Sequence, residues 1–228
     1  MVTVALQKKL GAFFTPPDVA RTLVRWAVRR PSDKLLDPSC GDGRFLESHL
    51  NSVGVDCDVG SVVAATKRSG HATVYAAGFF DWASASQERF DCVAGNPPFI
   101  RYQQFAGTER EKALQICARL GAKFTALTSS WAPFLVVAAT MLKPGGRMAF
   151  VVPAEIGHAP YATPLLAFLT RHFSRVQLVA IREKLFPDLS EDVWILFADG
   201  FQETTDHILL SQQEKFVVGQ VAPPNNGL

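Results

Sequence analysis

The tetrapeptide Asn96-Pro97-Pro98-Phe99 contains the residue types that methyl transfer to a planar amine requires. The amino nitrogen of a base such as adenine shares its lone pair with the ring, so it is a weak nucleophile until hydrogen bonds to its two N–H groups pull it toward pyramidal geometry. The Asn96 side-chain oxygen and the Pro97 carbonyl can accept these bonds, because consecutive proline rings hold the backbone rigid. An ordinary turn remains the alternative, since Asn before Pro commonly ends a β-strand.

A second motif lies upstream, where a short apolar strand runs into a glycine-rich turn. Residues 34–37 end in the carboxylate of Asp37, and Gly41 and Gly43 let the backbone bend closely around a ligand before an expected helix. A strand, a glycine turn and a helix in this order mark a nucleotide-type site. A dinucleotide pyrophosphate is disfavoured, because Leu46 stands where such a turn has its third glycine.

Length and composition allow one large α/β domain. The chain has 228 residues, 48% of them apolar, and 23 basic against 21 acidic residues leave a net charge of only +2. Any binding to nucleic acid must therefore come from a local patch. There are four widely spaced cysteines, Cys40, Cys57, Cys92 and Cys117. The lack of a Cys-x-x-Cys pair disfavours a metal site and favours reduced thiols in a cytoplasmic protein.

No apolar run in the sequence is long enough to cross a membrane, and residues 1–11 lack the apolar core of a signal peptide. We therefore expect no membrane partner.

Strand-like segments alternate with helical patterns along the chain. We expect strands at residues 34–37, 54–56, 72–77, 90–94, 147–152, 175–181 and 193–198. The alternation predicts a doubly wound, mainly parallel, seven-stranded Rossmann-like sheet with helices on both faces. Residues 182–192 are too few for a comfortable crossover, so the last two strands should form an antiparallel hairpin at one edge.

Two helices have clear sequence signals. The first begins at Pro16 and Pro17 and reaches about Arg30, with Thr15 in the capping position. The second covers residues 130–142 and ends at the turn 143–146.

The order of these motifs resembles that of the γ-class amino-methyltransferases, chiefly the N6-adenine-specific DNA methyltransferases of restriction-modification systems. The resemblance covers roughly residues 11–200 and implies a methyltransferase fold, S-adenosylmethionine as cofactor and double-stranded DNA as substrate. It assigns residues 1–200 to a catalytic domain and residues 201–228 to a tail or the start of a target-recognition region. Family members that read a sequence carry such a region, so a separate domain or partner subunit is expected to do so here.

The resemblance also implies roles for individual residues. The cofactor-binding residues would be Phe14, Thr15, Asp37, Ser39, Gly41, Asp56, Cys57 and Phe79. The catalytic residues would be Asn96, Pro97, Pro98 and Phe99, with Phe99 and Phe186 stacking on an adenine that is flipped out of the duplex. Because Arg101 directly follows this motif, it is the candidate contact to the DNA backbone.

Several of these residues have simpler interpretations. Asp37 could cap a turn, Asp56 could be an ordinary exposed carboxylate, and Phe186 could belong to the core. A helical stripe of Arg21, Arg25 and Arg29 is better interpreted as a solvated face than as a DNA contact.

One position departs from the family pattern. The third strand usually ends in an acidic residue that binds the amine of the cofactor's adenine, and Gly78 stands there in this chain. The missing charge-assisted hydrogen bond corresponds to about 1.5 to 3 kcal/mol unless Asp81 or water replaces it. A non-catalytic DNA-binding subunit with the same fold therefore stays open as an alternative. A methyltransferase for RNA adenine or a protein glutamine amide is a second alternative, because these enzymes use the same planar-amine chemistry and related Asn-Pro-Pro motifs.

Overall fold

The computed structural model describes residues 14–186 and 192–223. One eight-stranded sheet forms its centre, in the order β3-β2-β1-β4-β5-β7-β6-β8. The strands are β1 (Leu35–Asp37), β2 (Ser52–Asp56), β3 (Thr73–Ala76), β4 (Phe90–Gly95), β5 (Leu142–Pro153), β6 (Phe173–Ile181), β7 (Val193–Phe201) and β8 (Leu209–Gln213). The predicted α/β fold with a mainly parallel sheet is confirmed.

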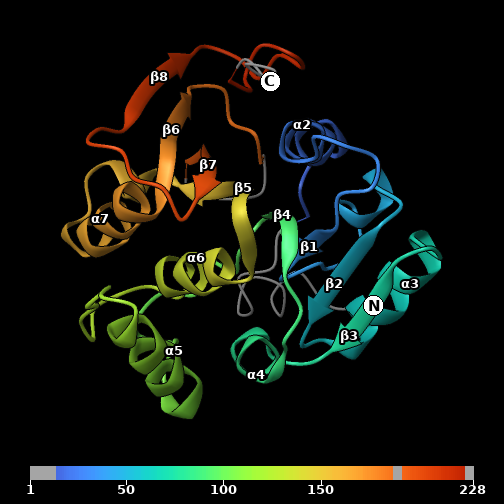
Figure 1. Ribbon diagram of the computed structural model, residues 1–228, viewed down its shortest axis with the longest axis horizontal. Helices are drawn as coiled ribbons and strands as arrows, with labels where there is room; N and C mark the ends of the chain where they lie inside the picture. The colour runs from blue at the N-terminus through green and yellow to red at the C-terminus, as the bar shows by residue number, and fades with distance from the viewer. Residues whose placement is uncertain (1–13, 187–191, 224–228) are drawn as a thin grey trace.

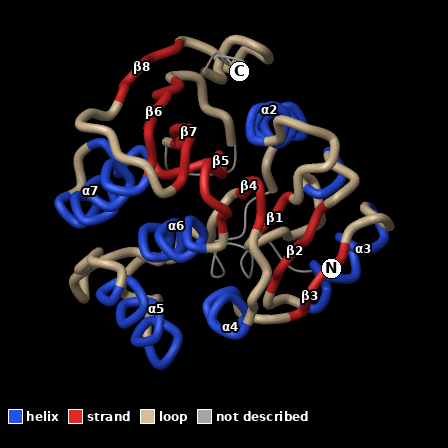
Figure 2. Tube along the Cα trace, in the orientation of Figure 1, coloured by secondary structure: helices blue, strands red, loops and turns tan. Residues whose placement is uncertain are grey.

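Helices cover both faces of the sheet, as Figures 1 and 2 show. The α-helices are α2 (Pro17–Ala27), α3 (Val59–Arg68), α4 (Phe79–Ala85), α5 (Gly107–Arg119), α6 (Trp131–Thr140) and α7 (Thr163–His172), and short 3-10 turns are η1 (Leu46–Ser48), η2 (Ala154–Gly157) and η3 (Pro160–Ala162). In Figure 1, α2 and α3 lie on one side of the sheet and α4, α5, α6 and α7 on the other. The sheet is therefore buried between two helical layers.

The direction of the strands places the site. Among the described strands only β7 is reversed, because it pairs antiparallel with both β5 and β6 while every other pairing is parallel. The carboxyl ends of β1, β2 and β4 consequently lie at the same edge of the sheet. The loops that follow these three strands carry the glycine turn, Asp56 and the Asn-Pro-Pro-Phe motif.

The sequence prediction was wrong about the number of strands and about the edge. The β6–β7 hairpin is antiparallel as predicted, but β7 lies between β5 and β6, and β6 is covered by the eighth strand, β8. Residues 209–213 belong to the segment 201–228 that the sequence assigns to a tail or the start of a target-recognition region, and only Leu209 and Leu210 among them are apolar. An edge strand with exposed side chains does not need the apolar pattern of a buried strand.

Several predicted boundaries also shift. The N-cap of α2 is Pro16 and not Thr15, and the Pro16 carbonyl accepts hydrogen bonds from Val19 and Ala20. Helix α2 ends at Ala27, three residues before the predicted end. The helix expected after Gly43 is only the short turn η1, and the predicted turn 143–146 belongs to β5, with Gly145 at a φ of 74°.

Helix α6 is the most buried helix of the fold. Every residue from Trp131 to Ala139 is buried, and the helix packs against α4, α5, α7 and β5. An apolar helix enclosed on all sides is held rigidly by its neighbours. No helix in the described ranges has the length and apolarity needed to cross a bilayer.

Candidate active site

A pocket at the carboxyl edge of the sheet brings together residues from three separate motifs. Phe14 and Thr15 precede α2, Ser39 and Gly41 belong to the turn after β1, and Asn96 follows β4. The remaining lining residues are Cys40, Asp42, Arg44 and Phe45. Five residues that the sequence assigns to cofactor binding or catalysis therefore share one cavity.

The glycine turn shapes the floor of this pocket. Gly41 and Gly43 adopt φ values of 51° and 87°, in the left-handed region that disfavours residues with a side chain. A Cβ at Gly43 would lie 2.9 Å from the Ala65 backbone, so this glycine lets the turn pack on α3. A Cβ at Gly41 would meet nothing within 4 Å, because this residue borders the open pocket.

Asp37 is fully buried behind the turn. Its Oδ1 atom accepts a hydrogen bond from the Ser39 backbone N–H at 3.2 Å, whereas Oδ2 has no hydrogen-bond partner among the described residues. Burial raises the pKa of Asp37 well above its usual value, and the nearby Asp56 and Asp42 raise it further. A Cβ at Gly95 would lie 2.7 Å from Oδ1, so glycine at the end of β4 makes room for this carboxyl.

Asp56 is tied to the same turn. Its Oδ2 accepts from the Gly41 backbone N–H at 2.8 Å, and its Oδ1 accepts from Asp58 N–H at 2.9 Å. Burial raises the pKa of Asp56, while these two backbone bonds lower it. The interpretation of Asp56 as an ordinary exposed carboxylate is therefore wrong, because the residue is half-buried and its two hydrogen bonds to backbone N–H groups order the turn. Cys57, which follows it, is exposed.

Arg44 fixes the segment before α2 over the pocket. Its Nη1 donates to the Thr15 carbonyl at 2.8 Å, and its Nε donates to the Asp42 carboxylate at 3.1 Å. The guanidinium also lies 5.1 Å from the centre of the Phe14 ring, within cation–π distance. Arg44 thus connects the glycine turn to the two predicted cofactor contacts Phe14 and Thr15. Residues 11–13 of the same predicted motif lie outside the described residues.

Two serines hold the backbone of the Asn-Pro-Pro-Phe corner. The Ser39 hydroxyl donates to the Asn96 carbonyl at 3.0 Å, and the Ser130 hydroxyl donates to the Pro98 carbonyl at 2.6 Å. The Pro97 carbonyl accepts no hydrogen bond from the described part of the chain. Of the backbone carbonyls of Asn96, Pro97 and Pro98, that of Pro97 therefore stays available to a ligand.

The aromatic residues predicted to contact ligands are mostly covered. Phe99 is 9% exposed and Phe186 5%, and both belong to the main core cluster. Phe79 is also 5% exposed and packs on Phe134 with ring centres 4.6 Å apart. Stacking on a base or on the cofactor would require a neighbouring segment to uncover these rings, so their roles remain predictions. Pro187, which follows Phe186, lies outside the described residues.

The space beside Gly78, the position where the family pattern has an acidic residue, is unfilled by other described residues. A Cβ at Gly78 would meet nothing within 4 Å, and Gly78 is the N-cap of α4 with no side chain to cap it. Asp81 does not replace the carboxylate, because it is exposed and its Oδ1 pairs with Lys112 Nζ at 2.7 Å.

The candidate DNA contacts lie outside the pocket. Arg101 is exposed in the turn after the catalytic motif, where its carbonyl accepts from Gln104 and Phe105. The predicted arginine stripe has local roles: Arg21 on α2 pairs with Asp18, and Arg29, which lies beyond the end of α2, donates to the Gly145 carbonyl.

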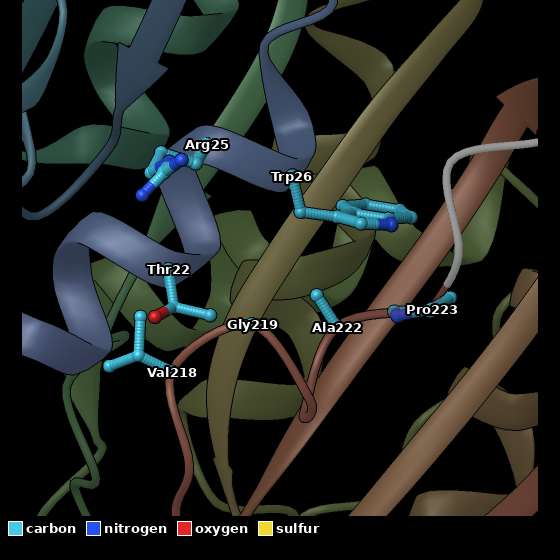
Figure 3. A pocket seen from close by; sticks show the side chains of 7 residues that line it. All are labelled: Thr22, Arg25, Trp26, Val218, Gly219, Ala222 and Pro223. Carbon is cyan, nitrogen blue, oxygen red and sulfur yellow. The ribbon is translucent and has the colours of Figure 1, made fainter. Parts of the chain in front are cut away.

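A second pocket lies between α2 and the C-terminal segment (Figure 3). Its lining residues are Thr22, Arg25, Trp26, Val218, Gly219, Ala222 and Pro223. It shares no residue with the first pocket and includes none of the predicted site residues.

Comparison with known protein families identifies the group to which this fold and this pocket belong. The profile of the Eco57I restriction-modification methylase family matches residues 57–186, more than half of the chain. The chain belongs to the Eco57I restriction-modification methylase family. A second profile, that of the N-6 DNA methylases, matches residues 1–63 and so includes the glycine turn.

Curated relatives agree with this membership. The type II methyltransferase M.HincII of Haemophilus influenzae is 26% identical over 194 residues, which are 82% of this chain and 36% of that protein. M.TthHB8I of Thermus thermophilus is 27% identical over 161 residues, 64% of this chain and 35% of the relative. The chain thus spans about a third of the length of the curated relatives that it matches.

Solved structures share the fold at lower identity. The methyltransferase subunit of a type I restriction-modification system from Streptococcus thermophilus superposes with a TM-score of 0.69 and 18% identity, over 88% of this chain and 47% of that one. The type ISP restriction-modification enzyme LlaBIII, solved bound to DNA, gives 0.70 and 13%, over 91% of this chain and 20% of the larger enzyme. These likenesses support the methyltransferase-like fold.

Membership in this methylase family implies S-adenosylmethionine as the cosubstrate, and the charges of the residues around the glycine turn fit a ligand of this kind. Burial raises the pKa of Asp37, and the carboxylates of Asp56 and Asp42 lie close enough to raise it further by repulsion. A ligand that carries positive charge relieves this repulsion. The Asp37 Oδ2 atom, buried without a partner, supplies an acceptor for such a ligand. The described residues contain no cluster of three or more His, Cys, Asp or Glu that could hold a metal ion.

Sequence reasoning missed the structural role of two residues. Ser130 was recognised only as the start of a helix, and Ser39 only as part of the cofactor turn. The bond of Ser130 joins segments 32 residues apart in the sequence, and that of Ser39 joins segments 57 residues apart. No local pattern signals such a contact.

Proposed function

We propose that this chain is the catalytic region of an enzyme that methylates the N6 amine of adenine in double-stranded DNA. The observation that carries the proposal is the shared pocket, in which Asn96 borders the same cavity as Thr15, Ser39 and Gly41. Catalysis between two bound molecules requires the acceptor-binding group and the cofactor-binding turn to be adjacent.

S-adenosylmethionine supplies an electrophilic methyl group when it is bound. The residues of the chain bind and orient. Asp37 and the glycine turn hold the cofactor, Phe14 and Thr15 cover it, and Asp56 keeps the turn in shape. The Asn96 side chain and the Pro97 carbonyl accept the two N–H groups of the target amine, which concentrates its lone pair on the nitrogen.

The target base must leave the duplex to reach this pocket. Flipping costs a few kcal/mol, and stacking on an aromatic side chain such as Phe99 or Phe186 offsets about 1 to 3 kcal/mol for each contact. Arg101 is proposed to bind a phosphate beside the flipped nucleotide. Reading of the recognition sequence by a separate domain or partner subunit stays a prediction.

A tritiated-methyl assay tests the proposal. Purified protein is incubated with labelled S-adenosylmethionine and, in separate reactions, with duplex DNA lacking N6-methyladenine, with RNA, and with a peptide-release factor. We expect label only in DNA, and in N6-methyladenosine after digestion to deoxynucleosides. Label in RNA or protein would identify one of the two alternative substrates. Calorimetry that detects no binding of S-adenosylmethionine would instead favour a non-catalytic subunit.

A further inference from the structure

Ser130 connects the buried helix α6 to the catalytic corner through three hydrogen bonds. Its hydroxyl donates to the Pro98 carbonyl at 2.6 Å and accepts from the Ile100 backbone N–H at 3.0 Å. Its own backbone N–H donates to the Ile100 carbonyl at 3.0 Å. The residue therefore satisfies Pro98 and Ile100 much as a neighbouring strand would.

The hydroxyl makes these bonds instead of capping its own helix. Ser130 is the N-cap of α6, a position where serine commonly accepts from the N–H groups of the first turn. Here its dihedral angles are already helical, with φ −59° and ψ −34°, and the side chain makes no capping bond. Both hydrogen-bonding functions of the hydroxyl are directed at the loop.

The anchor is rigid. Ser130 is 1% exposed, and the nine residues that follow it are all buried in the core. The loop after the catalytic motif is less enclosed, because residues 101–104 are exposed. A bond from the rigid helix to this loop fixes the backbone just beyond the diproline.

We propose that Ser130 is a positioning residue that holds the diproline corner with the Pro97 carbonyl directed at the target amine. Ser39 occupies the Asn96 carbonyl and Ser130 the Pro98 carbonyl, which leaves Pro97 as the acceptor between them. The inference rests on the proposed function, because it specifies how that site is aligned. Ser130 acts through the loop and does not itself touch the substrate.

Three variants of the full chain test this role. Ser130→Ala removes both bonds of the hydroxyl, and Ser130→Thr restores a hydroxyl at the same place. Thr140→Ala is the matched control, because Thr140 lies at the other end of α6 and its hydroxyl donates to the Val137 carbonyl at 2.7 Å. Each variant is compared with the wild type for thermal unfolding, hydrogen exchange, cofactor affinity by calorimetry and single-turnover methylation of unmethylated duplex DNA.

We expect faster amide exchange over residues 96–105 in Ser130→Ala alone, with unchanged cofactor affinity. Its methyl-transfer rate should fall by about 10- to 100-fold, because small misplacements of reacting groups cost this much. Ser130→Thr should recover most of the rate, and Thr140→Ala should retain it. Unchanged exchange, or faster exchange with an unchanged rate, would overturn the proposal.

Two further outcomes are also decisive. If Ser130→Ala does not fold, the comparison passes to Ser39→Ala, measured at saturating S-adenosylmethionine because Ser39 borders the cofactor pocket. This variant should transfer methyl more slowly than the wild type, and an unchanged rate would overturn the proposal that the two serines leave the Pro97 carbonyl as the acceptor. A wild-type protein that labels no DNA would contradict the proposed function, and the exchange measurement would then decide the role of Ser130.

Discussion

At the scale of single residues, the site depends on carboxyl groups held in an unfavourable environment. Asp37 has no exposed surface, and Asp56 and Asp42 lie near it. Groups with strongly shifted pKa values commonly mark functional sites, because folding leaves them in an environment that a ligand can improve. The cost of burying Asp37 is therefore a measurable property of the site.

The stability of the protein should depend on the protonation of Asp37. Burial raises its native pKa above the ordinary value of 3.8, so below that value both folded and unfolded states carry the neutral acid. As the pH rises through the window up to the raised pKa, the unfolded state loses its proton more readily and stability falls. Asp37→Asn should thus raise the free energy of unfolding by about 1 to 3 kcal/mol near pH 8 and change it little near pH 3.5.

Denaturant titrations at several pH values measure this effect, and Asp81→Asn is the control because Asp81 is exposed. Calorimetry should show that Asp37→Asn binds S-adenosylmethionine more weakly even while it is more stable. A variant that is less stable than the wild type at pH 8 would show that Asp37 is held as a favourable anion.

The sequence predicted where some residues of the site lie, but it did not predict how deeply others are buried. Asn96, Ser39 and Gly41 lie together in the pocket because their motifs follow parallel strands whose carboxyl ends share one edge, and the alternation of strands and helices in the sequence predicts such a parallel sheet. The burial of Phe99, Phe186 and other rings was not predictable in the same way. It depends on packing between distant segments, which no local pattern encodes.

At the scale of elements, helix α4 begins at the position where the family pattern expects an acid. Gly78 has an ordinary φ of −67°, and a side chain there would enter open space. An aspartate at this N-cap would interact favourably with the first turn of α4. The fold is thus compatible with the residue that the chain lacks.

Gly78→Asp should strengthen the binding of S-adenosylmethionine. One charge-assisted hydrogen bond corresponds to about 1.5 to 3 kcal/mol, or a tenfold or larger decrease in Kd. Gly78→Ala is the control, because it changes the backbone freedom equally without adding a carboxylate. Equal affinities of the two variants in calorimetry would show that the cofactor's adenine does not lie beside Gly78.

The elements themselves were mostly predictable. Buried parallel strands are short apolar runs, and each of the seven predicted runs forms a strand. The eighth strand was missed because Leu209–Gln213 lies at the edge, where its side chains stay exposed and its sequence is polar. The cap at Thr15 was also wrong, because two prolines let the Pro16 carbonyl begin α2 without a side-chain cap.

At the scale of the whole molecule, the site and the reversed strand occupy different parts of the sheet. The pocket lies at β1 and β4, while β7, β6 and β8 extend the sheet on the far side of β5. The C-terminal segment after β8 returns to the core, where Val221 is 1% exposed. Residues 202–223 therefore contribute to the fold, and none of them lines the pocket at the glycine turn.

Truncation separates these contributions. Removal of residues 202–228 should lower the free energy of unfolding by about 2 kcal/mol or more, because burial of a single valine side chain contributes about 1.5 to 3 kcal/mol. Cofactor affinity should survive this truncation. A loss of affinity at temperatures where the truncated protein is folded would show that the C-terminal segment and the cofactor site are coupled.

The most direct test of the account is the activity of Asn96→Ala beside its cofactor affinity. If the Asn96 side chain and the Pro97 carbonyl activate the target amine, this variant transfers no detectable tritiated methyl to duplex DNA and still binds S-adenosylmethionine as the wild type does. Methylation of adenine by Asn96→Ala at the wild-type rate would contradict the account.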